Sequence, residues 1–340
     1  MYPCQLCRAN RHACIYGHGS PPCDMCIRKG KACWSEICTA RASLPGVLMD
    51  LQSLDLSGRV EKGPLALAGG TYSDVDFGEL TSEDGTNLNM LVVIKQLRPK
   101  ILPPKVLEKC IASELTIWSR TSHPNVLPLL GYSLDFGPYP AFITEWMPEG
   151  TLSDYVKNHP TVHKLFLVCG VARGLKYLHG KWIVHSDLKC CNIVVSDSGV
   201  PMLMDFGLSR QLDCSRKILT TRETTGTCRW MAMEFFDAGT DAPVAPIATF
   251  ESDVWSFGMT VLEIISKEVP YRQYQHDTQA MFAIAKGELP RAPKLQTTCD
   301  QEMWELCKTC WTKKDARPSM TTVLDLLSSN SLQLTIVIGN

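Results

Sequence analysis

The sequence predicts an α+β protein in which a small strand-rich lobe precedes a larger helical lobe, with a cysteine-rich module in front of both. Short apolar runs typical of strands fill residues 61–146, and apolar side chains at helical spacing fill residues 147–333. Six of the 16 cysteines fall near the N-terminus. That segment has too few large apolar side chains to form a core unless disulfides or a bound metal cross-link it. These observations divide the chain into a module at 1–37, a connector at 38–60, the two lobes, and a tail at 334–340.

The strand-rich lobe is expected to contain one helix, at residues 104–121, among five short strands. The expected strands are residues 65–68, 74–80, 90–97, 126–132 and 141–146. In the helical lobe, apolar side chains repeat at helical spacing from Leu165 to Leu178. Residues 253–266 are apolar almost all round, which predicts a helix buried on every side.

The net charge of −1 by itself implies neither a polyanionic partner nor a membrane surface, but the charge is unevenly distributed. Residues 1–33 carry five Lys or Arg and one Asp, a formal charge of +4, so the remainder carries −5. The sequence has no charged-then-apolar leader and no run of 18 uncharged apolar residues, so we expect neither a secretion signal nor a membrane span. We therefore expect an intracellular, reducing environment, in which dense cysteines bind metal more often than they form disulfides.

The cysteine-rich module contains a tandem repeat of one spacing, C-x2-C-x6-C. Its members are Cys4, Cys7, Cys14, Cys23, Cys26 and Cys33. Each Zn²⁺ takes four ligands, and six thiolates satisfy two ions if two of the sulfurs bridge. The segment resembles the fungal Zn2Cys6 binuclear cluster, which implies two bound Zn²⁺ ions. Two alternatives stay open, namely three disulfides or a single-zinc ribbon made by the first, second, fourth and fifth cysteines.

The resemblance to a binuclear cluster also implies a short helix that enters the major groove of DNA. Arg8 and Arg11 match basic positions of that family, and Arg11 lies where a base-reading residue is expected. Six thiolates and two Zn²⁺ sum to −2, however, which reduces the +4 of the segment to about +2 and weakens phosphate binding. Duplex DNA is therefore one possible partner of residues 1–37, and a structural or protein-binding role is the alternative. We expect a nuclear location if the module binds DNA and a cytoplasmic location otherwise.

A lysine and a glutamate in the strand-rich lobe are expected to form an ion pair. Lys95 ends an apolar strand, and Glu114 shares one face of the predicted helix with Cys110 and Ile117. A carboxylate inside an apolar stripe is costly unless a cation pairs with it. Lys95 is the cation that we expect to do so.

Two polar motifs follow in the helical lobe. Residues 185–192 read HSDLKCCN, and residues 205–207 read DFG after a predicted strand. With the apolar strand that ends in Lys95, these motifs in this order and spacing resemble the protein kinase family, most closely its tyrosine-kinase-like group. The resemblance covers about residues 58–330, with further matches at 123–131, 226–234, 253–258, 310–311 and 317–318.

The resemblance implies a two-lobed kinase fold that transfers the γ-phosphoryl group of ATP, with Mg²⁺, to a Ser or Thr hydroxyl of a protein substrate. Asp187 would orient that hydroxyl and accept its proton, while Lys189 would neutralise charge on the moving group. Asn192 and Asp205 would hold Mg²⁺. Lys95, paired with Glu114, would contact the α- and β-phosphates. Lys189 is typical of Ser/Thr-specific members rather than Tyr-specific ones.

Further residues are expected at ATP by their place in the kinase pattern. Thr144 matches the residue at the back of the ATP pocket, and Glu145 and Met147 match the segment that contacts adenine. The expected phosphate-loop residues are Ala68, Gly69, Gly70 and Val75. Gly70 alone keeps a glycine of G-x-G-x-x-G, and glycine lets backbone approach phosphate closely, so we expect weakened ATP binding.

Two other departures from the kinase pattern remove no catalytic group: Ser186 replaces the usual arginine, and Met233 replaces the proline of A-P-E. The sequence therefore favours an ATP-dependent Ser/Thr protein kinase with an N-terminal zinc module. The alternative is a pseudokinase scaffold, or a transcription regulator that acts through the zinc cluster. Mg²⁺-dependent ATP binding and phosphotransfer would distinguish these hypotheses.

Overall fold

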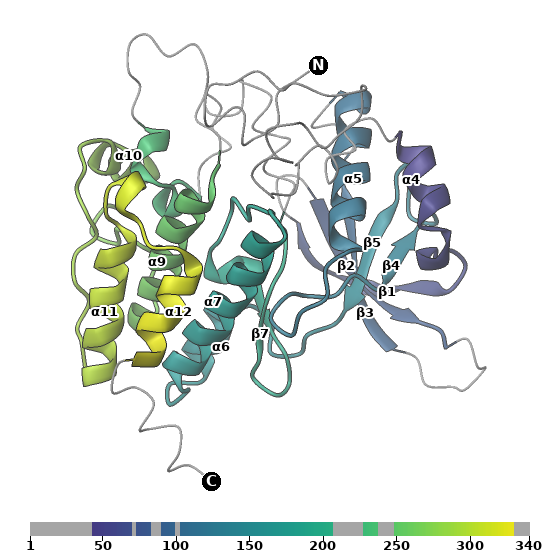
Figure 1. Cartoon of the computed structure of the whole chain (residues 1–340). Helices are drawn as coiled ribbons and strands as arrows, with labels where there is room; N and C mark the ends of the chain where they lie inside the picture. Colours follow the sequence, from purple (N-terminus) through teal and green to yellow (C-terminus); the bar gives the residue numbers. More distant parts are fainter. Residues whose placement is uncertain are drawn as a thin grey trace. The chain divides into compact units, whose positions relative to one another are not determined.

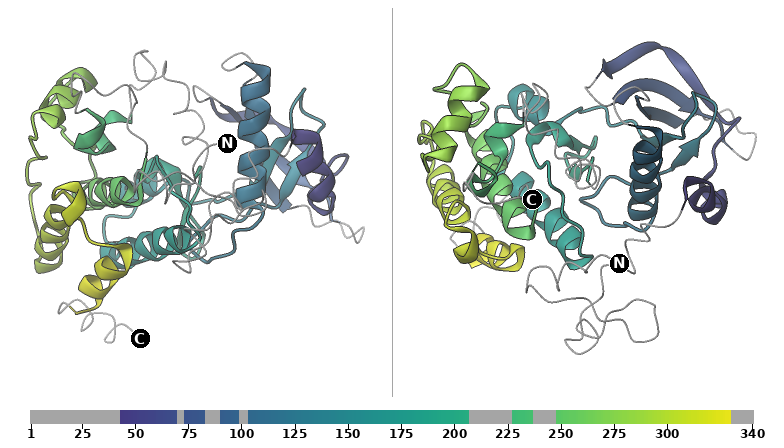
Figure 2. Two further views of the ribbon diagram at one scale, coloured as in Figure 1. Left: turned by 45° about the horizontal axis from the view of Figure 1, so that its top comes forward. Right: turned by 90° about the horizontal axis from the view of Figure 1, so that it is seen from above.

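The computed structural model describes residues 43–69, 73–82, 90–98, 103–206, 227–236 and 248–329 (Figure 1). They belong to two compact units. The first combines the described residues of Met1–Arg120 with Leu129–Thr144, and the second combines Thr121–Pro128 with the described residues of Glu145–Asn340. The first is built mainly from strands and the second mainly from helices, as predicted for the two lobes (Figure 2). None of the described helices has both the length and the apolar composition that a membrane span requires.

The first unit is built on a five-stranded sheet with the strand order β1-β2-β3-β5-β4. The strands are β1 (Val60–Gly69), β2 (Ser73–Leu80), β3 (Met90–Leu97), β4 (Gly131–Ser133) and β5 (Ala141–Glu145). The pairs β1–β2, β2–β3 and β4–β5 are antiparallel. Val92 and Ile94 of β3 belong to one buried cluster with Ala141 and Ile143 of β5, so alternate residues of the central strands form the core.

Two helices complete the first unit, α4 (Leu44–Asp50) and α5 (Pro104–Trp118). α4 falls within the segment expected as a connector, yet it is fastened to the sheet, because the Tyr132 hydroxyl donates to the Leu48 carbonyl at 3.1 Å. The chain after α4 crosses β4 so closely that a Cβ at Gly131 would lie 2.2 Å from the Leu54 carbonyl oxygen. Only glycine allows that approach, so this segment packs as part of the sheet unit.

Two predicted boundaries are wrong. The helix expected to reach residue 121 ends at Trp118, and the strand expected at 126–132 is confined to Gly131–Ser133. The Leu127 N–H donates instead to the Leu203 carbonyl at 2.9 Å, and Val126 forms an isolated parallel bridge with Leu203. The backbone partner of this apolar run is therefore distant in the chain, which the local pattern could not reveal.

The described residues of the second unit form six α-helices and one hairpin. The helices are α6 (Leu152–Asn158), α7 (Lys164–Gly180), α9 (Phe250–Ser266), α10 (Asp277–Ala285), α11 (Thr298–Cys310) and α12 (Met320–Ser329). The hairpin pairs β6 (Ile193–Val195) with β7 (Pro201–Leu203). The short 3-10 helices are η2 (Gln52–Leu54) in the first unit and η3 (Cys190–Asn192), η5 (Cys228–Trp230), η6 (Met233–Phe235) and η7 (Lys314–Ala316) in the second.

Helix α9 is the buried centre of the second unit, which confirms the prediction for residues 253–266. It begins with a capping box. The Thr249 hydroxyl oxygen accepts from the Ser252 N–H, and the Ser252 hydroxyl oxygen accepts from the Thr249 N–H. Every residue from Ser252 to Ile265 is buried. The apolar side chains that repeat along α7 also face the core, since Leu165 and Leu178 are both buried. The polar groups that α9 carries therefore lie inside the protein, where each needs a partner.

A buried ion pair joins η6 to the segment before α12. Arg317 donates to both carboxylate oxygens of Glu234 at 2.7 Å. Its side chain is 0% exposed, against 23% for Glu234, and its guanidinium lies 5.0 Å from the Trp255 ring centroid. The pair is bidentate, a geometry that arginine forms with carboxylates in particular.

We predict that Glu234→Ala lowers the free energy of unfolding of this unit by about 3 kcal/mol or more, because it leaves a buried guanidinium without its anion. Urea denaturation followed by tryptophan fluorescence measures the change. Arg272→Ala is the matched control, since Arg272 pairs with Glu268 on an exposed surface and should contribute less than about 1 kcal/mol. Equal effects of the two substitutions would contradict the prediction.

Candidate active site

The first unit contains the predicted ion pair. Lys95 on β3 and Glu114 on α5 approach to 3.6 Å between Nζ and Oε1, with side chains that are 12% and 1% exposed. Glu114 lies among buried apolar residues of α5, so the lysine neutralises a charge that could not otherwise remain there. The pair predicted from the apolar stripe is thus confirmed. It holds the Lys95 ammonium in a fixed place on the sheet.

The strand register aligns the expected phosphate-loop residues with this lysine. Val75 of β2 lies opposite Lys95 of β3 and also opposite Ala68 of β1, while Gly69 lies opposite Asp74. Ala68, Val75 and Lys95 therefore occupy one row across three strands. Gly70 lies outside the described residues.

The three residues expected to contact ATP at the back of its pocket and at adenine lie at the end of β5 or just after it. Thr144 is buried, Glu145 is exposed, and Met147 is buried. Thr144 is the last residue of the first unit, and from Glu145 onward the chain belongs to the second. The chain thus passes from one unit to the other at the segment that the kinase pattern assigns to adenine.

In the second unit, Asp253 of α9 anchors the loop that contains Asp187. Its carboxylate accepts hydrogen bonds from the backbone N–H groups of His185 and Ser186, both at 2.8 Å. A third contact, 2.9 Å, joins it to Nε2 of His179. Ser186 has φ of 68°, in the left-handed region, and its hydroxyl donates to the His185 carbonyl at 2.6 Å. The anchor therefore maintains a backbone conformation that non-glycine residues rarely adopt.

The two carboxylate oxygens of Asp187 differ in their partners. Oδ2 accepts from Nδ2 of Asn192 at 2.7 Å and lies 3.1 Å from Nζ of Lys189. Oδ1 is buried and has no hydrogen-bond partner among the described residues. The geometry orients one oxygen firmly and leaves the other to accept a proton from a hydroxyl.

The β6–β7 hairpin brings Asn192 close to the residue before Asp205. Ile193 pairs with Leu203, and the Met204 N–H donates to the Asn192 carbonyl at 3.0 Å. Because Nδ2 of Asn192 is used by Asp187, Oδ1 is its atom that can bind a cation. An amide oxygen and the carboxylate of Asp205 are hard oxygen donors, which suits Mg²⁺. The two residues predicted to hold magnesium therefore fit that ion in chemistry.

His185 acts in this loop as a buried structural group. Its side chain is fully buried and meets the ring of Phe206 edge-on, with centroids 6.4 Å apart. Burial lowers the pKa of its imidazole, so the ring is neutral at pH 7. Its Nδ1 accepts weakly from the Asp187 N–H at 3.4 Å, which adds a second support to the loop.

Two residues at this site were not found from the sequence. Thr227 accepts a hydrogen bond from Nζ of Lys189 at 2.7 Å. It lies within the kinase match at 226–234, but that match assigned it no role. Glu263 accepts from the Cys190 N–H at 2.9 Å and from Trp230 Nε1 at 2.7 Å. Burial raises the pKa of Glu263. A carboxylate within the apolar run at 253–266 was a usable signal, by the same reasoning that found Glu114.

Two adjacent cysteines follow Lys189, of which Cys190 is buried and Cys191 is exposed. Cys190 is fully buried, and burial raises the pKa of the Cys191 thiol to about 11. Cys307 and Cys310 are both fully buried on α11, where they pack in the core. Among the described residues, no group of three or more His, Cys, Asp or Glu is arranged to hold a metal ion.

The predicted zinc ligands lie outside the described residues. They are Cys4, Cys7, Cys14, Cys23, Cys26 and Cys33, together with the predicted nucleic-acid contacts Arg8 and Arg11. The zinc cluster therefore stays a prediction from the cysteine spacing.

Comparison with known proteins gives the same assignment as the site geometry. The family described as "Protein tyrosine and serine/threonine kinase" matches residues 65–327. Similar curated proteins are the serine/threonine-protein kinases STY46 and STY17 of Arabidopsis thaliana, 30% and 29% identical over 77% and 74% of this chain. Mitogen-activated protein kinase kinase kinase 5 of the same organism is 27% identical over 96% of the chain.

The chain spans less than half of each of these relatives, 42% of the first two and 44% of the third. The matched region nevertheless covers most of the described residues of both units and every kinase motif described above. With the Lys95–Glu114 pair in one unit and the Asp253-anchored loop of Asp187 in the other, the chain belongs to the protein kinase family.

Proposed function

We propose that the protein is a Mg²⁺- and ATP-dependent kinase that phosphorylates Ser or Thr hydroxyls of protein substrates. The observation that carries this proposal is the state of Asp187, whose carboxylate is fixed through Oδ2 while Oδ1 has no partner among the described residues. The relatives named as serine/threonine-protein kinases support the same activity.

The chain's own residues would act by positioning and by charge. Asp187 orients the substrate hydroxyl and takes its proton as the hydroxyl oxygen attacks phosphorus. Lys189 lies between Asp187 and Thr227, so its ammonium is held where charge develops on the moving group. Lys95, kept in place by Glu114, is the cation for phosphate oxygens. Bound Mg²⁺–ATP would supply the phosphoryl group, with Asn192 and Asp205 as ligands of the metal.

Specificity for Ser and Thr is supported by Lys189. Its side chain is 13% exposed and bridges the catalytic carboxylate to Thr227, the first residue of the described segment 227–236. In Tyr-specific kinases a lysine is usually absent at this place, which makes room for a longer acceptor. A lysine fixed by two partners favours the shorter Ser and Thr side chains.

We predict that Asp187→Asn lowers kcat by at least about 100-fold, because an amide cannot take the substrate proton. Lys95→Met and Asp205→Asn should also abolish transfer, and Asp205→Asn should remove the Mg²⁺-dependent part of ATP binding. A radiolabelled phosphotransfer assay and nucleotide-induced thermal shifts measure the two effects. Asp197→Asn makes the same chemical change at an exposed turn of the β6–β7 hairpin and should leave the rate unchanged. Wild-type protein that neither transfers phosphate nor shifts with Mg²⁺–ATP would instead indicate a pseudokinase.

A second prediction concerns regulation and rests on Ser186. In many kinases an arginine at this place needs the anion of a phosphorylated activation loop. Ser186 is uncharged, and its hydroxyl is already used by the His185 carbonyl. We therefore expect phosphatase treatment to leave the basal rate within about threefold, while a Ser186→Arg variant should become sensitive to loop phosphate. A tenfold drop in wild type, about 1.4 kcal/mol of barrier, would show that the loop is phosphate-gated.

We also propose that residues 1–37 bind zinc through the six cysteines of the C-x2-C-x6-C repeat. The regular spacing supports this, since a packed core would not require cysteine at each of those places. Duplex DNA is a candidate ligand of the module, with Arg8 and Arg11 as the residues that would contact it.

Elemental analysis of the full-length protein should therefore give two Zn²⁺ per chain. The described residues hold no competing cluster, so bound zinc reports on the N-terminal module. Cys14→Ser should lower the ratio, because Cys14 belongs to the six-cysteine cluster but not to a four-cysteine ribbon. A ratio of one that survives Cys14→Ser would support the ribbon, and zinc-free protein with three disulfides would exclude both.

A further inference from the structure

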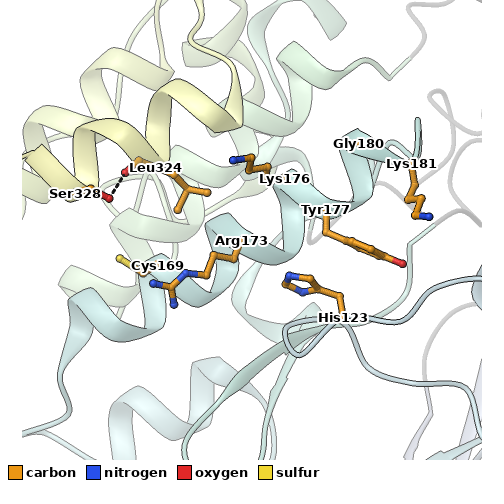
Figure 3. Close-up of a pocket in the computed structure, with 9 residues that line it drawn as sticks. All are labelled: His123, Cys169, Arg173, Lys176, Tyr177, Gly180, Lys181, Leu324 and Ser328. Carbon is orange, nitrogen blue, oxygen red and sulfur yellow. Dashed lines mark hydrogen bonds between the residues drawn. The ribbon is translucent and has the colours of Figure 1, made fainter. Parts of the chain in front are cut away.

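A basic pocket lies between α7 and α12, within the second unit. Its volume is about 600 Å³. Figure 3 shows that Arg173, Lys176 and Tyr177 project from α7, while Leu324 comes from α12 and His123 from the loop before Val126. None of these residues belongs to the catalytic loop or to its supports, so the kinase function leaves the pocket unexplained.

The charge of this pocket has one sign. The exposed side chains of Arg173, Lys176 and Lys181 line the pocket. No carboxylate is among the residues that line it. Within the part of the chain that the structure describes, Arg173 and Lys176 form no ion pair. Residues three apart on a helix share a face, so the first two charges add. Burial and the charge of Arg173 lower the pKa of His123, so at neutral pH the pocket owes its charge to the other three residues.

The pocket also has an ordered aromatic and apolar side. The rings of His123 and Tyr177 stack with centroids 4.8 Å apart, and the Tyr177 hydroxyl accepts from the Ser122 N–H at 2.8 Å. Leu324 adds an aliphatic surface that is partly buried. Surface lysines on a solvated helix face would have none of these features. A pocket that combines apolar surface with convergent polar groups is the usual form of a recognition site.

We propose that this pocket is a docking site for an acidic segment of a partner protein, in which Asp or Glu side chains flank an aliphatic anchor. The carboxylates would pair with Arg173 and Lys176, and the anchor would lie on Leu324 and Tyr177. The volume is larger than a single small anion needs. Residues 330–340, which follow α12, contain no acidic side chain and so do not match the charge of the pocket.

The test measures binding without ATP, so it is independent of the proposed phosphotransfer. The probe is a fluorescein-labelled peptide of alternating Glu-Glu and Leu, followed by fluorescence anisotropy with the full-length protein. We expect saturable binding that weakens with salt, and at least tenfold weaker binding when Gln replaces each Glu. Arg173→Glu with Lys176→Glu should weaken binding at least tenfold, and the corresponding Gln pair should weaken it less.

The matched control reverses two exposed lysines elsewhere in the same unit, Lys286→Glu with Lys294→Glu. It changes net charge equally and should keep the affinity within twofold. Leu324→Asn should weaken the Glu-Leu peptide but not an all-Glu peptide of equal length. Thermal unfolding midpoints confirm that each variant folds, and the Gln pair provides the test if the Glu pair does not fold.

Three results would overturn the proposal. Equal loss in the control and pocket variants would indicate attraction by net charge alone. Complete displacement by millimolar inorganic phosphate, with no dependence on Leu324, would indicate a small-anion site. Absence of saturable binding to the Glu-Leu peptide would show that the pocket does not recognise acidic segments.

Discussion

The geometry of the candidate active site depends on one buried carboxylate, Asp253. It is 1% exposed, and its two oxygens accept the backbone hydrogens of His185 and Ser186 and contact His179. Charge-assisted hydrogen bonds of this kind are about twice as strong as neutral ones, which offsets the cost of removing the carboxylate from water. They also compensate for the left-handed backbone at Ser186, a conformation that costs on the order of 1–3 kcal/mol.

Helix α9 extends this support along its length. Asp253 near its beginning holds the backbone before Asp187, and Glu263 near its end holds the Cys190 N–H and the indole of Trp230. Trp230 belongs to η5, directly after Thr227, so a single buried helix positions the catalytic loop and the segment that contacts Lys189. Close packing on every side holds α9 in one position. Its few polar groups then hold the segments of the site that they bond.

The sequence was informative where a local pattern carried the physical cause. The Lys95–Glu114 pair follows from a carboxylate in an apolar stripe, and the buried α9 follows from apolar residues on all faces. Glu263 satisfied the same criterion and was overlooked because its partners, a backbone N–H and an indole, carry no charge that a motif displays. The run at Val126 could not be placed, since its hydrogen bonds go to Leu203. The zinc module remains a prediction based on spacing alone.

Burial of the thiols in the kinase fold has a consequence for chemical labelling. Burial raises the thiol pKa of seven described cysteines, namely Cys169, Cys190, Cys191, Cys228, Cys299, Cys307 and Cys310. Alkylating reagents attack the thiolate, so these groups react slowly at neutral pH while the fold is intact. In native protein, a thiol-directed fluorophore should thus react more slowly with this set than with thiols that a chelator releases from the predicted zinc module, so the same reagent would test whether that module holds metal.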